Sequence, residues 1–339
     1  MTALPNRRLE DWKYTDLRNS VDADVVASAP TAAWSVALAS GAVDIADLPE
    51  IMPRGEHGAM AEFATSLAKA GPYARIAKGE TGAIHLHVTE GGHGRALIVV
   101  EDGASLALQE TVTAADFVNI AVEIIIGKHA RLDHVRLAPH KDAAQVVDYA
   151  VRVAEGGAYR AHFANFGAKI SRTDLHISLE GEGAQAHLSG VGVLDGTHAD
   201  VTTHVTHAAG KTQSTQLFKY VAGGHARGVY QSKVTVAQGA NGADSRQTAK
   251  GLLLEDRAEI DLKPELEILA DDVKCAHGAA IGDLDADSLF YLRSRGIPEN
   301  EARALLMRAF LGDAIEQIED EQIRDTVWQA VDGALEAMS

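Results

Sequence analysis

The chain has 339 residues, enough for a large core and for one to three domains; 46% of them are hydrophobic but only 5% aromatic. The formal net charge of −17 leaves no basic surface to neutralise phosphates, which excludes nucleic-acid binding and disfavours an anionic membrane surface. The single cysteine excludes an internal disulfide and fits a reducing cytosol.

The N-terminal sequence favours a cytoplasmic location. No apolar core follows the Arg7-Arg8 pair, so we expect no signal peptide. No apolar run approaches the roughly 18 residues that a membrane span requires. We therefore expect a soluble, cytoplasmic protein.

Residues 1–78 are expected to form an N-terminal mixed and helical region. A short helix or turn is predicted at residues 9–17. A longer helix is predicted at residues 59–70, where apolar residues recur at i, i+3, i+4 and i+7. The Gly71-Pro72 pair would end it.

From about Gly79 the sequence repeats itself. Each unit contains a short apolar triplet, a polar turn with glycine, a small residue and then alternating apolar and polar residues. The small residues that mark successive units are Ala104, Ala130, Ala158, Ala184 and Ala240. The first four are separated by 26, 28 and 26 residues, and the last follows after two steps of 28.

This period predicts a parallel β-helix over residues 79–283, in which each coil buries its apolar face against the next. A Greek-key sandwich would also have frequent short strands, but it does not explain the longer period. After Ala240 similar units follow at shorter intervals, of 18 and then 15 residues. We therefore expect the regular coil to be closed off near Cys275.

Residues 284–339 are predicted to form a C-terminal helical domain. Asp285 is a suitable N-cap for the first helix, and Gly296 a suitable terminator. Pro298 could occupy the first position of the second helix. A third helix is expected from about Glu321.

Cys275 and His277 are the residues most suggestive of chemistry. In an extended strand their i, i+2 spacing directs both side chains to one face. A lone cysteine is usually a small buried hydrophobe, however, and a lone histidine a satisfied polar residue. The pair could form half of a metal site, because it lacks the second ligand pair that zinc and cluster motifs contain.

Three other patterns point less clearly to function. Residues 208–212 resemble the end of a P-loop, but Val205 stands where the first glycine is required, and the flanks favour strands; we reject a nucleotide site. The pairs His85/His87 and His204/His207 have incomplete ligand sets and are expected to face solvent.

Three aspartates keep a carbohydrate-active β-helix enzyme open as an alternative. Asp148, Asp174 and Asp200 are 26 residues apart, which suggests that they stack on adjacent coils. Polysaccharide lyases and hydrolases use clustered carboxylates on one face. A stacked acid ladder would be repulsive unless it were solvated or occupied by cations.

Several segments together resemble the SufD type of the SufB/SufD family, the scaffold subunits of the SUF iron–sulfur cluster assembly system. The resemblance is strongest in residues 264–278 and 289–297, extends to residues 215–220 and 251–260, and includes the N-terminal residues 10–18. It implies a mainly β fold: a right-handed parallel β-helix core flanked by N-terminal mixed and C-terminal helical segments.

The resemblance also implies partners and site residues. His277 matches a family histidine at the interface between the SufB and SufD subunits, where a nascent cluster forms, and Cys275 matches its neighbour. The C-terminal helices would dock the SufC ABC-type ATPase. The residues expected on that docking surface are Phe290, Tyr291, Arg293, Arg295, Leu305, Arg308 and Phe310.

The donor chemistry agrees with a shared site. Iron–sulfur clusters generally take about four ligands, and one thiolate with one imidazole cannot hold a stable cluster alone. We therefore expect a non-catalytic scaffold that binds a transient cluster, through Cys275 and His277, together with a SufB-like subunit. In isolation the chain could form a homodimer through the same face. A carbohydrate-active enzyme and a homomeric metal-binding protein remain the alternatives.

Overall fold

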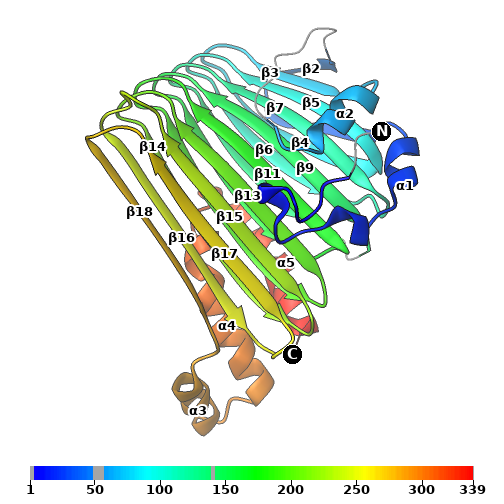
Figure 1. Cartoon of the computed structure of the whole chain (residues 1–339), viewed down its shortest axis with the longest axis vertical. Helices are drawn as coiled ribbons and strands as arrows, with labels where there is room; N and C mark the ends of the chain where they lie inside the picture. Colours follow the sequence, from blue (N-terminus) through cyan, green and yellow to red (C-terminus); the bar gives the residue numbers. More distant parts are fainter. Residues whose placement is uncertain (1–3, 49–56, 139–141, 339) are drawn as a thin grey trace.

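The computed structural model describes residues 4–48, 57–138 and 142–338. Two nine-stranded sheets lie face to face and run the length of the molecule (Figure 1). The even sheet contains, in order, β1 (Ala33–Gly41), β4 (Thr81–Glu90), β6 (Ser105–Val112), β8 (Arg131–Ala138), β10 (Ala158–Asn165), β12 (Gln185–Asp195), β14 (Gln213–Gly223), β16 (Ala243–Leu253) and β18 (Val273–Gly282). The odd sheet contains β2 (Val43–Asp47), β3 (Pro72–Ile76), β5 (Gly92–Val100), β7 (Val118–Ile126), β9 (Ala144–Val153), β11 (Ile170–Leu179), β13 (His198–His207), β15 (Arg227–Val236) and β17 (Glu259–Ile268).

The chain passes alternately between the two sheets, so each odd strand and the even strand that follows it form one coil. From β3 to β18 the neighbours within each sheet are parallel. This arrangement is a β-solenoid of eight coils, which confirms the predicted mainly β, solenoid fold. The antiparallel strands β1 and β2 cover its N-terminal end.

Alternation within the strands explains the core. In β6 the inward residues Leu106, Leu108 and Val112 are buried, whereas the outward residues between them are half-buried. Side chains of this kind from both sheets form one continuous cluster along the solenoid. Corner glycines such as Gly103 and Gly183 have φ of +68° and +73°, a conformation that side chains with a Cβ rarely adopt.

The N-terminal region lies across the outer face of the odd sheet (Figure 1). It includes two 3-10 helices (Glu10–Trp12 and Leu17–Asn19), α1 (Ala23–Ser28) and α2 (Ala61–Leu67). We call residues 4–28 the strap. The helix predicted at residues 59–70 is confirmed, and the predicted turn near residue 9 forms the first 3-10 helix.

The C-terminal region contains α3 (Ala286–Ser294), α4 (Glu299–Ile315) and α5 (Glu321–Ala337). The α4–α5 hairpin packs on the outer face of the even sheet, and α3 projects beyond the solenoid (Figure 1). Asp285 caps α3 as predicted, accepting a hydrogen bond from the Ser288 amide at 2.8 Å. Pro298 is the N-cap of α4 rather than its first helical residue.

The predicted closing of the coil is wrong. Arg227 lies beside Glu259 in the odd sheet, and Ala243 beside Val273 in the even sheet, so the last coils are 32 and 30 residues long. The short intervals in the sequence arose because successive apolar units belong to opposite sheets. The solenoid therefore ends open. The division at residues 78 and 283 stays a prediction; the parallel ladder itself begins at β3.

Candidate functional site

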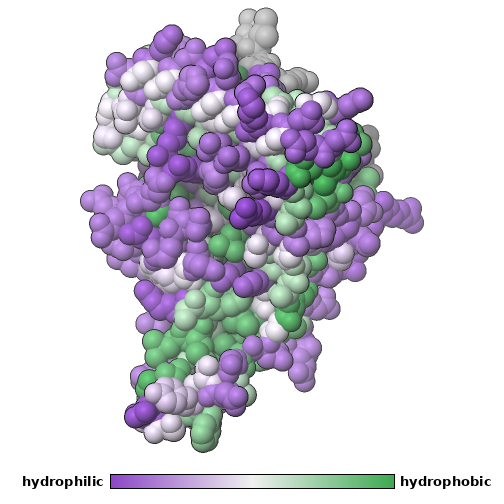
Figure 2. All heavy atoms as spheres, turned by 90° about the vertical axis from the view of Figure 1, so that its left-hand side faces the viewer, coloured by the Kyte–Doolittle hydropathy of each residue, from purple (hydrophilic) through white to green (hydrophobic). Residues whose placement is uncertain are grey.

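The open end of the solenoid is formed by β17 and β18, the last strands of the two sheets. Within the described residues each pairs with a neighbour on one side only. Both therefore present unpaired backbone N–H and C=O groups, which another strand could pair with. Figure 2 faces this end, and its lower part, toward α3 and α4, is the more apolar.

Cys275 and His277 lie on the inner face of β18. In the parallel register Cys275 is beside Ser245 and His277 is beside Gln247, and both of those β16 residues are fully buried in the solenoid interior. In the part of the chain that the structure describes, no further coil covers β18. Cys275 is consequently half-buried and His277 is exposed, although both occupy positions that are interior in every earlier coil.

The wall opposite them is apolar. Leu262 and Leu266 of β17 pack against the solenoid core together with Val273 and Cys275. Around this wall, Ile268, Leu269 and Ile281 are 42%, 58% and 45% exposed. The two donors are thus set in a rim of uncovered hydrophobic side chains, as is typical of a surface that a partner covers.

The thiol of Cys275 is not activated within this chain. Burial raises its pKa, and the nearby charge of Asp244 raises it further, although a hydrogen bond with the Ser245 backbone acts in the opposite direction. The thiol therefore holds its proton at neutral pH. A metal that binds there must displace the proton, because the thiolate is the ligand.

The number of donors tests whether a cluster could be held here. Residues 4–48, 57–138 and 142–338 contain no group of three or more His, Cys, Asp or Glu side chains placed to hold a metal ion. A cluster takes about four ligands, and this end of the solenoid offers two. Two donors are therefore too few to complete a cluster within the described residues.

The comparisons with known proteins decide the family. The family described as "SUF system FeS cluster assembly, SufBD core domain" matches residues 84–310. The chain belongs to the SufBD family. It is therefore a member of a family involved in SUF iron–sulfur cluster assembly.

Individual relatives point to the SufD type. The iron–sulfur cluster assembly protein SufD of Escherichia coli is 27% identical over 96% of this chain and 88% of its own length. A SufBD family protein of Synechocystis is 34% identical over 66% of this chain, and Protein ABCI7, chloroplastic, of Arabidopsis thaliana is 30% identical over 78%. The SufBD chain spans 52% and 57% of these two relatives.

Most of the predicted docking residues of this SufBD chain are exposed. Phe290 and Tyr291 on α3 are 74% and 56% exposed, and Leu305 on α4 is 48% exposed. Arg293 forms an ion pair with Glu299 at 3.2 Å at the start of α4. They lie on α3 and in the N-terminal half of α4, and α3 projects at the end of the molecule (Figure 1).

Arg295 is exposed like them, whereas the other two predicted residues are half-buried and contact other elements of the chain. The Arg295 guanidinium lies 5.1 Å from the centre of the exposed Tyr291 ring. Arg308 instead pairs with Asp332 of α5, and Phe310 packs under Lys219 of β14, whose ammonium lies 4.7 Å from the ring centre. The last two residues hold the α4–α5 hairpin together and onto the sheet.

Sequence reasoning did not anticipate the buried charges under the strap. Asp148 and Asp174 lie side by side in the register, as their spacing suggested. Asp200 instead lies beside Arg172, because that coil is two residues longer. Arg172 forms ion pairs with both Asp174 and Asp200 at 2.6 Å. All four are buried, so this ladder offers no open surface to a polysaccharide.

The expectation that the histidine pairs face solvent is wrong in part. His207 is fully buried in the solenoid interior, where it bonds to Thr212 and Ser214. His204 stacks on His176 at 4.7 Å. The sequence alone does not tell whether a strand histidine points into the solenoid or out of it. The pairing register of the strands decides which face each side chain occupies.

Two exclusions made from the sequence can be compared with the structure. The P-loop-like residues 208–212 form a turn between two strands, with no helix N-terminus to receive a phosphate, which confirms the strand prediction. Among the described residues, no helix is both long and apolar enough to cross a membrane.

Proposed function

We propose that this chain is a non-catalytic scaffold subunit in iron–sulfur cluster assembly, and that it completes a transient cluster site with a SufB-like subunit. Cluster iron and sulfide are the cargo, and His277 and Cys275 are the ligands that this chain contributes. The observation that carries the proposal is the position of both donors on the inner face of an uncovered terminal strand.

The same surface supports the choice of partner. A SufB-like solenoid that presents its own last coil would pair with the edges of β17 and β18 and cover Ile268, Leu269 and Ile281. Covering this apolar rim would supply association free energy at about 25 cal/mol per Å². It would also shield the cluster from water while leaving imidazole, a labile and protonatable ligand, on this side.

A second surface supports docking of a SufC-like ABC ATPase. The α3 projection exposes Phe290 and Tyr291 next to the positive charges of Arg293 and Arg295. Aromatic and arginine side chains are the residues that most often dominate binding energy at interfaces. Force applied to α3 would be transmitted through α4 to the even sheet, which carries β18.

The test is cluster assembly by the complete complex. His277→Ala should leave the fold and the association with the SufB-like subunit intact, because His277 is exposed, but should abolish or strongly reduce the cluster absorbance formed by the complex. Lys274→Ala is the matched control, since Lys274 is on the same strand with its side chain on the opposite face. Normal cluster yield in His277→Ala would overturn the assignment.

The same preparation separates the alternatives. A homomeric metal-binding protein would carry stoichiometric metal when purified without partners. A carbohydrate-active enzyme would turn over substrate as the isolated chain. A homodimer that pairs two open ends would dissociate when the SufB-like subunit is added, whereas a dimer formed elsewhere would persist.

A further inference from the structure

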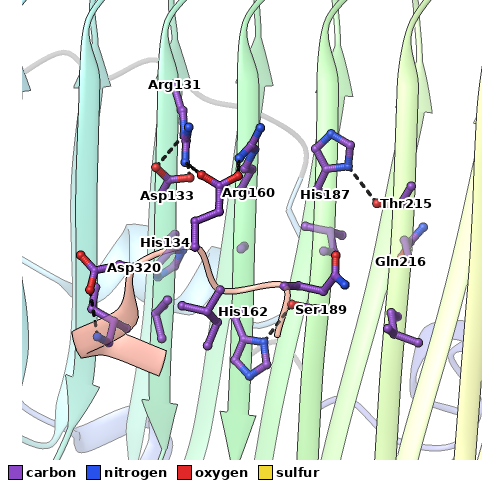
Figure 3. Close-up of a pocket in the computed structure, with 18 of the residues that line it drawn as sticks. Arg131, Asp133, His134, Arg160, His162, His187, Ser189, Thr215, Gln216 and Asp320 are labelled. Atoms are coloured by element: carbon purple, nitrogen blue, oxygen red, sulfur yellow. Dashed lines mark hydrogen bonds and ion pairs between the residues drawn. The ribbon is translucent and has the colours of Figure 1, made fainter. Parts of the chain in front are cut away.

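A cavity of about 730 Å³ lies on the outer face of the even sheet and extends to β16, the neighbour of the terminal strand β18. Its floor is made by outward side chains of β8 to β16, and its roof by residues 317–320, which connect α4 to α5 (Figure 3). Small-molecule sites commonly have volumes of about 300–1,000 Å³. The cavity is therefore large enough for a metabolite-sized ligand.

The floor carries a regular row of side chains. Arg160, His187, Thr215 and Arg246 occupy the same register position on four successive strands. Strands are spaced by about 4.8 Å, so the backbones of the two arginines are about 14 Å apart. Between them His187 Nδ1 and the Thr215 hydroxyl are hydrogen-bonded at 2.8 Å. The row thus has a positive charge at each end and polar, uncharged groups in the middle.

A carboxylate from the roof occupies one end of the row. Glu319 forms ion pairs with Arg160 and with Arg131, the latter at 2.6 Å (Figure 3). Arg131 has a second carboxylate, Asp133, at 2.7 Å, whereas Glu319 is the one anionic partner of Arg160 found in the described residues. All these groups are at least one-third exposed, so the contact can exchange with an anion from solution.

A buried histidine lines the same space beside the row. His162 is 2% exposed and lines the cavity beside Arg160. Its Nδ1 is hydrogen-bonded to the Ser189 hydroxyl at 2.8 Å, but its Nε2 has no hydrogen-bond partner. The Nε of Arg160 is also buried and unpartnered. Both atoms expose less than 1 Å² of surface, so a ligand in the cavity contacts the outward row rather than these two atoms.

We propose that this cavity binds a small organic molecule with an anionic group, phosphate or carboxylate, at each end. One anionic group replaces Glu319 at Arg131 and Arg160, and the other reaches Arg246. The polar middle of the ligand bonds to the His187–Thr215 pair. Because Glu319 belongs to the turn between α4 and α5, ligand binding also frees that turn from the sheet.

The charges favour this class over a neutral ligand. Arg246 has only a distant carboxylate neighbour, Asp244 at 3.6 Å, and its side chain is 72% exposed. Removing Glu319 from the row leaves Arg160 without its anionic partner. A ligand with an anionic group at each end restores both pairings at once, because planar guanidinium groups bind phosphate and carboxylate in a bidentate manner.

Isothermal titration of the full chain at low salt tests the proposal with three probes: fructose 1,6-bisphosphate, adipate and neutral fructose. Both anionic probes should bind, the tighter of the two showing whether phosphate or carboxylate is preferred, and fructose should not bind. Arg160→Gln should weaken binding about tenfold, the loss expected for one charge-assisted contact. Glu319→Gln should strengthen binding about tenfold, because it removes the competing carboxylate.

Arg257→Gln is the matched control, an exposed arginine in the turn between β16 and β17 that should leave affinity unchanged. If Arg160→Gln does not fold, Glu319→Gln still tests the proposal. The expected effect of Glu319→Gln is tighter binding, which a misfolded protein would not show. Absence of binding by both anionic probes would overturn the proposal. Binding that neither Arg160→Gln nor Glu319→Gln alters would also overturn it, because the ligand would then lie elsewhere.

Discussion

The indole of Trp12 lies over the guanidinium of Arg172, with 4.1 Å between the ring centre and Cζ. Trp12 is 2% exposed, and Arg172 is fully buried beneath it. The strap is therefore attached to the odd sheet by a large hydrophobic ring that also covers a buried charge. This contact links residue 12 to the middle of the solenoid, 160 positions later in the chain.

Trp12→Ala should lower the free energy of unfolding by about 3–5 kcal/mol, because it opens a cavity and exposes the Arg172 charge cluster. Trp12→Phe keeps a ring over the guanidinium and should cost much less. Urea denaturation followed by circular dichroism measures both. Equal losses for the two variants would show that the ring over Arg172 contributes nothing.

A second prediction concerns pH and His57. Burial opposes the charged imidazolium, but hydrogen bonds with Asp148 at 2.9 Å and Glu123 at 2.7 Å outweigh it and raise the His57 pKa to about 9. Because the folded pKa is above the ordinary 6.5, the stabilisation is complete below pH 6.5 and is lost as the pH rises through 9. It amounts to about 3 kcal/mol.

Asp174 changes stability in the same direction. Burial raises its pKa to about 7, with a contribution from the neighbouring charge of Asp148, although Arg172 lowers it. A raised carboxyl pKa favours the folded state at low pH, and that advantage is lost as the pH rises from about 4 to 7. The unfolding free energy should fall between pH 6.5 and 9, and His57→Gln should flatten the curve in that window. His85→Gln, on the even sheet, is the control. It should leave the slope of the unfolding free energy between pH 6.5 and 9 unchanged.

The alternation of apolar and polar residues and the length of the sequence repeat were enough to predict the solenoid. Each coil must bury one face of every strand, whichever apolar residues it uses. These two features were not enough to place Asp200, since one coil that is two residues longer moves it from Asp174 to Arg172. The site shows the same limit. The spacing of Cys275 and His277 predicted a shared face, but their exposure depends on β18 being the last strand, and the sequence instead suggested a closed end.

The reactivity of Cys275 gives a third prediction. Its raised thiol pKa predicts slower alkylation by iodoacetamide at pH 7 than that of N-acetylcysteine, with a rate that still increases above pH 9. Cys275 is the only cysteine in the chain, so one mass adduct reports it directly. Adding the SufB-like subunit should slow the reaction further. Unchanged alkylation in that complex would place Cys275 outside the interface.

A fourth prediction concerns attachment of the α4–α5 hairpin. Lys219 of β14 is buried, and its ammonium donates a hydrogen bond to the Phe310 carbonyl at 2.6 Å and pairs with Asp313. Lys219→Met should destabilise the docked hairpin by about 2 kcal/mol, the value of a charged hydrogen bond. Hydrogen exchange in α4 should accelerate accordingly. Lys250, beside Lys219 in the register but exposed, is the control.

The last prediction concerns a charged network inside the solenoid. Glu110 is completely buried; it accepts hydrogen bonds from Tyr149 at 2.6 Å and Arg136 at 3.2 Å and lies 3.3 Å from His134. Burial alone would raise its pKa, but the hydrogen bond with His134 and the charge of Arg136 outweigh it, and the Glu110 pKa is lowered. Its stabilisation is therefore present above pH 4.5 and is lost as the pH falls through the lower folded value.

Glu110→Ala should cost about 3–5 kcal/mol, because it leaves the Arg136 charge buried without its partner. The double variant Glu110→Leu/Arg136→Met removes both charges and should recover most of that loss, since well-packed hydrophobic residues can replace a buried ion pair. Chemical denaturation at pH 7 compares the three proteins. If the double variant were as unstable as Glu110→Ala, the network would contribute through its hydrogen bonds to Tyr149 and His134 rather than through charge pairing.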